Sequence, residues 1–169
     1  MDATLPGDHA LHLDSAAREE WVANCEAAYP AVYRALIAIG ASEFDAADAL
    51  QDAFEDALKQ RRAVTSAQGW LFVVAVRSAR RGVRLPSFSL ERVRGRSGEG
   101  DIDALLDRME VGRLLAGLTE RQRAMVVAQF YLGLDHREIA AHFGVKTGTV
   151  SATLAQAKAR MRAEVRNAS

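Results

Sequence analysis

The stretch from His136 to Arg162 carries polar side chains whose types and spacing suit contact with nucleic acid. Its apolar residues recur every three or four positions, which predicts helices, and Gly144 divides the stretch into two. Hydroxyl and amide groups can contact base edges or phosphates, while Lys and Arg supply a salt-dependent attraction to phosphates. The positions left exposed on the second helix are Lys146, Thr149, Ser151, Ala152, Thr153, Gln156, Lys158 and Arg160.

The small and apolar residues of the same stretch fit a helix-turn-helix. In that motif a small residue lies where the two helices cross, and a glycine allows the sharp turn between them. Ala140 and Gly144 occupy these two places. Apolar side chains flank them at Ile139, Phe143, Val145 and Val150. The stretch therefore predicts a helix-turn-helix, and an ordinary helical hairpin that binds no DNA is the alternative.

Two capping boxes predict where the helices of this part begin. Thr119 with Gln122 starts a helix that Gly133 stops, and Asp135 with Glu138 starts the first helix of the motif. In such a box each side chain accepts a hydrogen bond from the backbone N–H of the other residue. Both boxes depend only on residues three apart, so they are expected whatever the rest of the chain does.

The first half of the chain predicts three further helices. One runs from Ser15 to Gly40, a second follows Ser42 as its N-cap, and a third begins at Thr65 or Ser66. The apolar face of the second is expected at Phe44, Ala47, Leu50, Phe54 and Leu58. No run shows the alternation of a strand bounded by hairpin turns, so the expected fold class is all-α.

The composition divides the chain into two small helical domains joined by a flexible linker, and the second domain contains the helix-turn-helix. Residues 86–103 mix Pro, Ser, Gly and alternating charge without a sustained helical period, as a linker does. We therefore expect a mobile tail over 1–14, a first domain over 15–85, this linker, and a second domain over 104–169.

The formal net charge of zero conceals a strong segregation of charge along the chain. Residues 1–60 hold twelve Asp and Glu against three Lys and Arg, whereas residues 61–96 hold nine Arg and one Glu. Residues 121–169 are basic again, with eight Lys and Arg against three Asp and Glu. A local basic surface can collect phosphates whatever the remaining chain carries. Neutrality overall therefore does not exclude a nucleic-acid partner.

Several function classes find no support in the residues. No apolar run reaches the roughly 18 residues of a membrane span, and the first residues lack the pattern of a leader, so a cytoplasmic protein without membrane insertion is expected. Cys25 is the single cysteine and is expected to be a small buried residue, without a disulfide or a thiolate metal cluster. We expect no catalytic centre, no metal and no cofactor.

Residues 115–162 resemble region 4 of bacterial RNA polymerase sigma factors, above all of the extracytoplasmic-function group. The resemblance rests on a Gln-Arg pair before an apolar helix, then Gly-Leu, Glu-Ile-Ala, Gly-Val and Gly-Thr-Val in that order. The matching residues are Leu118, Gln122, Arg123, Gly133, Leu134, Glu138, Ile139, Ala140, Gly144, Val145, Gly148, Thr149 and Val150.

A second match to the same family lies upstream. Residues 44–58 are similar to sigma region 2.2, and Trp70 with Leu71 falls where the family has Trp-Leu before its promoter-melting helix. The matching residues of region 2.2 are Asp45, Ala46, Asp48, Gln51, Asp52 and Phe54. Two separate motifs in the family's order, with a linker between them, cover most of the chain.

The resemblance implies a sigma factor that binds core RNA polymerase and directs it to promoter DNA, without catalysis of its own. It implies polymerase binding through the region 2.2 helix, and an anti-sigma factor as a further partner. The implied polymerase-binding residues are Asp45, Asp48, Gln51, Asp52 and Phe54. The implied contacts to the minus-10 element are Arg77, Arg80, Arg81 and Arg84. The implied contacts to the minus-35 element are Arg137, Lys146, Thr147, Thr149, Ser151, Thr153, Gln156 and Arg160.

Two stretches carry fewer cations than the family pattern, and they keep other readings open. After Trp70-Leu71 the family's basic residues are replaced by Val73 and Val76, and the second motif helix has Ser151, Thr153 and Gln156 where the family commonly has Lys and Arg. One alternative is a sigma-like interaction protein that binds polymerase or an anti-sigma factor without reading DNA. Another is a helix-turn-helix regulator that binds duplex operators without polymerase.

Overall fold

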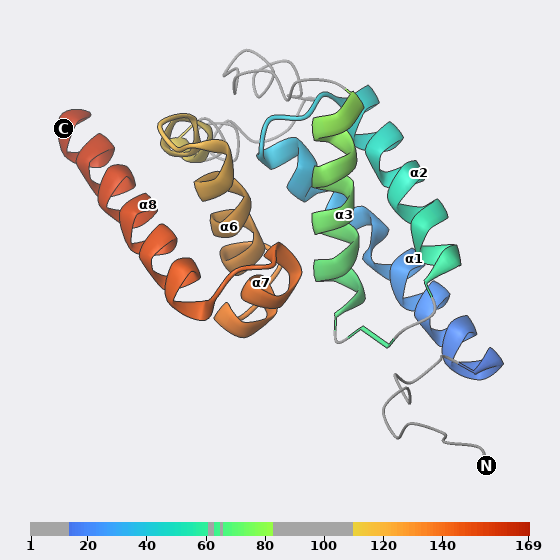
Figure 1. Cartoon of the computed structure of the whole chain (residues 1–169). Coiled ribbons are helices and arrows are strands. Elements are labelled where there is room, and N and C mark those ends of the chain that lie inside the picture. The colour runs from blue at the N-terminus through green and yellow to red at the C-terminus, as the bar shows by residue number, and fades with distance from the viewer. Residues whose placement is uncertain (1–13, 61–62, 65, 83–109) are drawn as a thin grey trace.

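The computed structural model describes residues 14–60, 63–64, 66–82 and 110–169, and within them every regular element is an α-helix. The expected all-α class is therefore confirmed. Residues 110–116 are also helical. The labelled helices are α1 (Ser15–Ala38), α2 (Glu43–Lys59), α3 (Ala67–Gly82), α6 (Glu120–Phe130), α7 (His136–Phe143) and α8 (Thr147–Asn167) (Figure 1).

The starts of the first three helices follow their capping residues. Asp14 accepts the N–H of Ala17 at 2.7 Å, and Ser42 accepts the N–H of Asp45 at 3.0 Å. Ser66 accepts the N–H of Gly69 at 3.1 Å, so α3 begins where the sequence predicts. Each cap satisfies a backbone donor that has no partner inside the helix.

The buried face of α2 consists mainly of alanines. Ala46, Ala49, Ala53 and Ala57 are buried together with Leu50, and they lie against α1 and α3. Side chains this small let helices approach closely, because the distance between two helix axes is set by the residues at their contact. The core of this half therefore depends on close helix approach.

The predicted apolar face of α2 is wrong in most of its residues. Phe44 is 79% exposed and Leu58 is 46% exposed, and only Leu50 of the predicted set is fully buried. The predicted face includes the large side chains of Phe44, Phe54 and Leu58, whereas the helix packs through its alanines. Large apolar side chains are consequently left on the outside of α2, where they are available to a partner.

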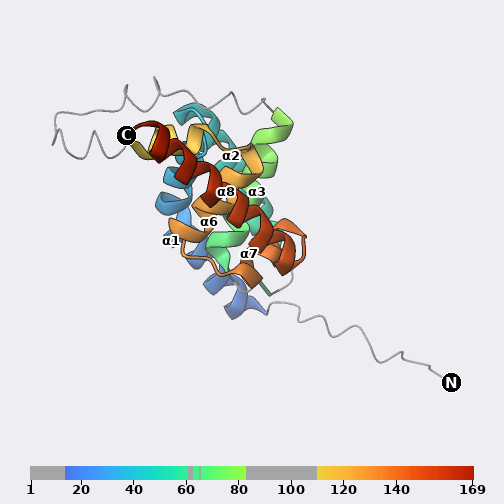
Figure 2. The same cartoon turned by 90° about the vertical axis from the view of Figure 1, so that its left-hand side faces the viewer.

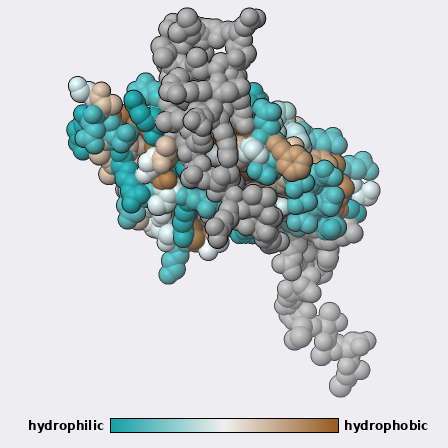
Figure 3. Space-filling model, turned by 90° about the horizontal axis from the view of Figure 1, so that it is seen from above, coloured by the Kyte–Doolittle hydropathy of each residue, from teal (hydrophilic) through white to brown (hydrophobic). Residues whose placement is uncertain are grey.

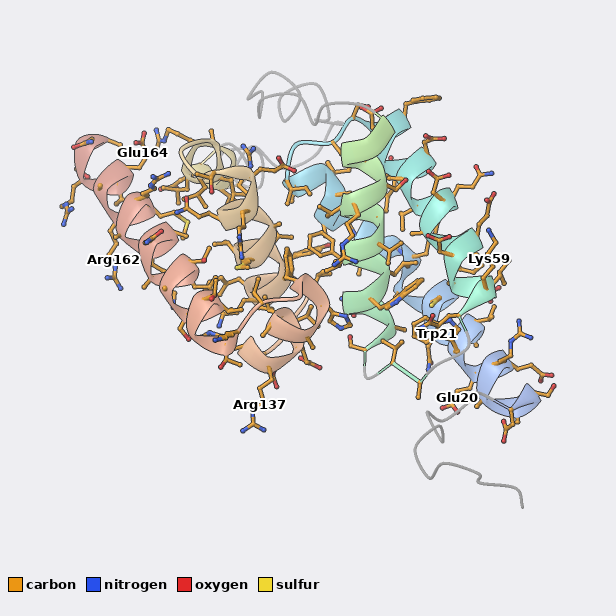
Figure 4. The ribbon with its side chains drawn as sticks, viewed as in Figure 1. Glu20, Trp21, Lys59, Arg137, Arg162 and Glu164 are labelled. Carbon is orange, nitrogen blue, oxygen red and sulfur yellow. The ribbon has the colours of Figure 1, made fainter. Side chains whose placement is uncertain are left out.

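A tryptophan pair closes the end of this half near the start of α1. The rings of Trp21 and Trp70 meet edge to face with centroids 5.2 Å apart and an interplanar angle of 79°. The indole N–H of Trp21 donates to the buried carbonyl of Ala57 at 2.9 Å. The pair thereby joins α1, α2 and α3, and Figure 4 shows Trp21 directed inward among them.

Cys25 lies fully buried beside the tryptophan pair, as expected of a small apolar residue. Burial raises the pKa of its thiol to about 11, because removing the group from water disfavours the charged thiolate. The thiol is therefore protonated at neutral pH and has none of the character of a reactive cysteine.

The helices α6, α7 and α8 form a second group, with α8 lying across α6 in the view of Figure 2. The two groups touch where α3 meets α7 and where α1 meets α6, and their buried residues form one continuous cluster. On the face shown in Figure 3, hydrophobic side chains appear as small separate patches among hydrophilic ones. Over the described parts of the chain, no helix has both the length and the apolarity to cross a membrane.

The predicted domain boundaries fall largely on residues outside the described ones. α1 to α3 lie within the predicted first domain of residues 15–85, and α6 to α8 lie within the second at 104–169. The linker over 86–103 and nearly all of the tail over 1–14 lie outside the described residues. The division into two domains stays a prediction.

Candidate functional site

The turn between α7 and α8 has the geometry of a helix-turn-helix. Gly144 adopts a left-handed conformation with φ of 67° and ψ of 36°, which a residue without Cβ tolerates at little cost. The N–H of Val145 then bonds the carbonyl of Ala140 at 3.0 Å. Ala140 is buried where α7 meets α8, whose own buried residues include Val150 and Leu154. The two helices are therefore held at a fixed angle.

Both predicted capping boxes are present and fix the starts of α6 and α7. Thr119 pairs reciprocally with Gln122, and Asp135 pairs reciprocally with Glu138. In the second box both hydrogen bonds measure 2.8 Å. Because α7 is the first helix of the motif, the second box fixes where the motif begins.

Asp135→Ala is expected to lower the free energy of unfolding by about 1 kcal/mol, since the first N–H groups of α7 lose their acceptor. Urea unfolding of the full chain, followed by circular dichroism, measures the change. Arg137→Ala is the control, because Arg137 is exposed and takes no part in the box. Equal stabilities for the two variants would contradict the role of the cap.

The residues predicted to contact a minus-35 element are mostly exposed, but they lie on two sides of α8. At 100° per residue, Thr147 and Ser151 fall on one side of the buried stripe, and Thr149 and Gln156 fall on the other. Lys146 is exposed at the turn, and Thr153 is half-buried. One face of a helix cannot present all of them to a single groove.

Contacts of individual side chains separate the two sides further. Arg160 donates from Nη1 to Oε1 of the buried Gln122 at 3.2 Å, which directs it toward α6. Arg137 extends away from the body of the protein at the start of α7 (Figure 4). The starts of α7 and α8, with Arg137, Thr147 and Ser151, thus form the candidate reading edge.

His136 belongs to this edge, although nothing in its sequence position indicated it. Its ring lies between α6 and α8, with Nε2 3.1 Å from Nε2 of Gln129 and Nδ1 3.1 Å from Oγ of Ser151. The sequence carries no signal for this role, because the side chains of Gln129 and Ser151 reach the two ring nitrogens only in the folded arrangement.

Of the arginines predicted for a minus-10 element, Arg77 is the one whose side chain is described. It is exposed, and its Nη2 donates to the carbonyl of His142 at 3.3 Å. Arg80 and Arg81 belong to α3, but their side chains, like the whole of Arg84, lie outside the described residues. In this arrangement Arg77 is directed at α7.

The contact of Arg77 belongs to a close approach between α3 and α7. A Cβ on the buried Gly69 would lie 2.7 Å from Cδ2 and Nε2 of His142 and 3.0 Å from Cδ1 of Leu134. Burial lowers the pKa of His142, and the nearby Arg77 lowers it further while Glu138 opposes the shift. Any larger residue here would have to displace the side chain of His142 or Leu134, which the sequence did not indicate.

The predicted polymerase-binding residues of α2 also divide into two groups. Asp48, Gln51 and Phe54 line a groove whose other walls are Tyr29, Phe44 and Ala47. Asp45 instead accepts the hydroxyl of Ser42 at 2.7 Å within the helix cap. Asp52 accepts the hydroxyl of Ser78, on α3, at 2.5 Å. The groove therefore contains three of the five predicted residues and two aromatic side chains that the prediction left out.

No group of His, Cys, Asp and Glu within the described ranges is arranged to hold a metal ion. The polar groups that the structure brings together are hydroxyls, amides and single charges at helix starts.

Comparison with known proteins finds a family match in the second helical group and a similar fold over most of the chain. Residues 108–161 match the family model of sigma-70 region 4. The sigma factor RpoE of Bartonella quintana, solved with the anti-sigma factor NepR, has a TM-score of 0.66 and 17% identity over 88% of this chain and 98% of its own. CnrH, solved with the cytosolic domain of CnrY, has a TM-score of 0.62 and 22% identity over 92% of both chains. No curated protein sequence matches the chain.

The two solved structures share the fold of the chain across both of its helical groups. The family match covers the helix-turn-helix itself, together with the two helical segments before it. Residues 108–161 thus match sigma-70 region 4, and the chain as a whole shares its fold with the solved structures of RpoE and CnrH.

Proposed function

We propose that the chain is a sigma factor, which binds core RNA polymerase through the groove on α2 and reads the upstream promoter element through the starts of α7 and α8. The observation that carries the proposal is the region 4 match over residues 108–161, which coincides with an exposed reading edge on a rigid helix-turn-helix. The polymerase performs the chemistry, and this chain supplies recognition.

The groove on α2 has the composition of a protein-binding surface. Phe44 and Tyr29 provide exposed aromatic area, and Asp48 and Gln51 add a negative charge and an amide beside it. Aromatic side chains that become buried on docking supply much of the binding energy at such surfaces, and a nearby charge favours a partner of opposite sign. A basic, partly apolar helix surface on the polymerase fits this groove.

The reading edge supplies the DNA contacts of the proposal. The first turn of the second helix of a helix-turn-helix reaches base edges, while the first helix approaches the phosphate backbone. Thr147 and Ser151 suit the former role and Arg137 suits the latter. The arginines of α3 are proposed to meet the minus-10 element once Arg77 leaves the carbonyl of His142.

An anti-sigma factor is the third proposed partner, and the cytoplasm is the proposed location because the polymerase works there. RpoE, a sigma factor that shares this fold, was solved with the anti-sigma factor NepR, and CnrH was solved with the cytosolic domain of CnrY. A partner that contacts both helical groups at once would hold Arg77 against α7.

Transcription in vitro, with purified core polymerase and a library of promoter fragments, tests the proposal. Specific initiation by the reconstituted holoenzyme is the expected result. Binding to core polymerase without initiation on any fragment would instead establish a sigma-like interaction protein. Binding to duplex operators without any association with core polymerase would establish a regulator of the repressor kind.

A further inference from the structure

The hydroxyl group of Ser151 is held from two sides within the protein. Its Oγ donates to the backbone carbonyl of Thr147 at 3.1 Å, and Nδ1 of His136 lies 3.1 Å from the same oxygen. His136 is in turn held by Gln129 of α6, at 3.1 Å from its Nε2. A chain of contacts from α6 through α7 thus holds the Ser151 hydroxyl of α8 at the reading edge.

The donors and acceptors of this chain of contacts can be assigned in order. The amide nitrogen of Gln129 is a donor only, so Nε2 of His136 accepts and carries no hydrogen. Nδ1 of His136 then carries the ring hydrogen and donates it to Oγ of Ser151. The single hydrogen of the serine goes to the carbonyl of Thr147. The ring hydrogen of His136 and the hydroxyl hydrogen of Ser151 are therefore both used inside the protein.

The opposite orientation of the Gln129 amide leads to the same state of the serine. Oε1 of Gln129 is buried without a hydrogen-bond partner, and turning the amide would offer it to His136 Nε2–H. Nδ1 would then be an acceptor and would take the hydroxyl hydrogen of Ser151. In both arrangements the hydroxyl hydrogen stays within the protein, and only lone pairs of Oγ are left for an outside partner.

Ser151 is nevertheless exposed, and it lies one turn into the second helix of the motif. In this position a side chain meets base edges in the major groove. That groove presents hydrogen-bond donors only at the amino groups of adenine and cytosine, whereas thymine O4, guanine O6 and N7 and the phosphates are acceptors. A serine oxygen whose hydrogen is already engaged can pair only with the amino groups of adenine and cytosine.

We propose that Ser151 acts as an acceptor that selects an adenine or cytosine amino group at one base pair, and that His136 and Gln129 are its positioning residues. The inference rests on the proposed function, since it assigns a base class to the same reading edge. It also separates Ser151 from the phosphate-binding role common to polar residues on such helices, because a phosphate oxygen offers no hydrogen.

Selection from promoters randomised in the upstream element, with holoenzyme reconstituted from the full chain, tests the assignment. On one strand, the wild type is expected to prefer adenine or cytosine over guanine or thymine at one position by about fivefold, the worth of one net hydrogen bond. Ser151→Ala is expected to remove the preference there and nowhere else. Retained preference in this variant overturns the inference, as does a wild-type preference at the affected position that does not divide adenine and cytosine from guanine and thymine on one strand.

Two variants of His136 test its positioning role. His136→Phe keeps a ring but frees the hydroxyl to rotate and donate, so guanine and thymine are expected to be accepted within about twofold of the preferred bases. His136→Asn places an amide near Nδ1 and is expected to restore the preference. Unchanged selectivity in the Phe variant, or no rescue by Asn, overturns the role of His136.

Ser169→Ala is a matched control, because the Ser169 hydroxyl likewise donates to the carbonyl four residues back, that of Val165, but lies at the far end of α8. It is expected to select as the wild type does, and a changed preference in it would overturn the assignment to Ser151. A wild-type holoenzyme that initiates but selects no upstream base overturns the inference alone. Failure to initiate on any fragment overturns the proposed function and the inference together.

Discussion

Phe44→Ala is expected to weaken binding of the chain to core RNA polymerase by about thirtyfold or more. The ring of Phe44 is 79% exposed in the free protein and lines the groove with Asp48 and Gln51. An exposed aromatic side chain that becomes buried at the centre of an interface contributes about 2 kcal/mol or more. Titration of labelled core polymerase with the full-length variant measures the loss.

Stability separates this effect from misfolding. Because Phe44 makes little contact in the free protein, its removal is expected to change the free energy of unfolding by less than about 0.5 kcal/mol. Leu58→Ala is the matched control, since Leu58 is an exposed apolar residue of the same helix that does not line the groove. Similar affinities for the two variants would remove the groove from the polymerase contact.

Gly69→Leu is expected to separate α3 from α7. A Cβ at this position already meets the His142 ring at 2.7 Å and the buried Leu134 at 3.0 Å, and the remaining leucine atoms need further space. Overpacking of this kind costs about 2 kcal/mol, whereas leucine favours the helical backbone of α3 more than glycine does. The first three helices are therefore expected to stay folded while the two groups part, which raises the radius of gyration in small-angle X-ray scattering.

A smaller substitution shows whether His142 is the obstacle. Gly69→Ala alone is expected to open the contact less than leucine does, because the ring of His142 can turn partly aside. Combining it with His142→Ala removes the atoms that the new Cβ would meet, so the double variant is expected to have the compact dimensions of the wild type. Equal dimensions for all variants would show that this approach does not hold the groups together.

The helix starts and the turn of the motif could be predicted because they depend on neighbours in sequence. The boxes at Thr119 and Asp135 are complete within four residues, and the left-handed turn at Gly144 needs only a residue without Cβ. The order of the helices and the helix-turn-helix followed from the same local signals, together with the spacing of apolar residues.

Features that depend on packing between distant residues could not be predicted in this way. Helix α2 turns its alanines inward because α1 and α3 lie close to it, and this exposes Phe44 against the rule that large apolar residues are buried. The separation of Asp52 from Asp48 likewise depends on Ser78 of α3. The tight space at Gly69 arises from His142, far along the chain.

The position of the two tryptophans makes tryptophan fluorescence a reporter of the N-terminal helices alone. The chain contains only Trp21 and Trp70, and they lie in contact between α1 and α3, so α6, α7 and α8 contain none. Tryptophan emission will therefore follow melting of the N-terminal helices. The helices α6, α7 and α8 can contribute only tyrosine emission, from Tyr131 at the end of α6. Emission and far-ultraviolet circular dichroism will diverge during unfolding if the two groups melt separately, and will coincide if the shared core makes them melt as one.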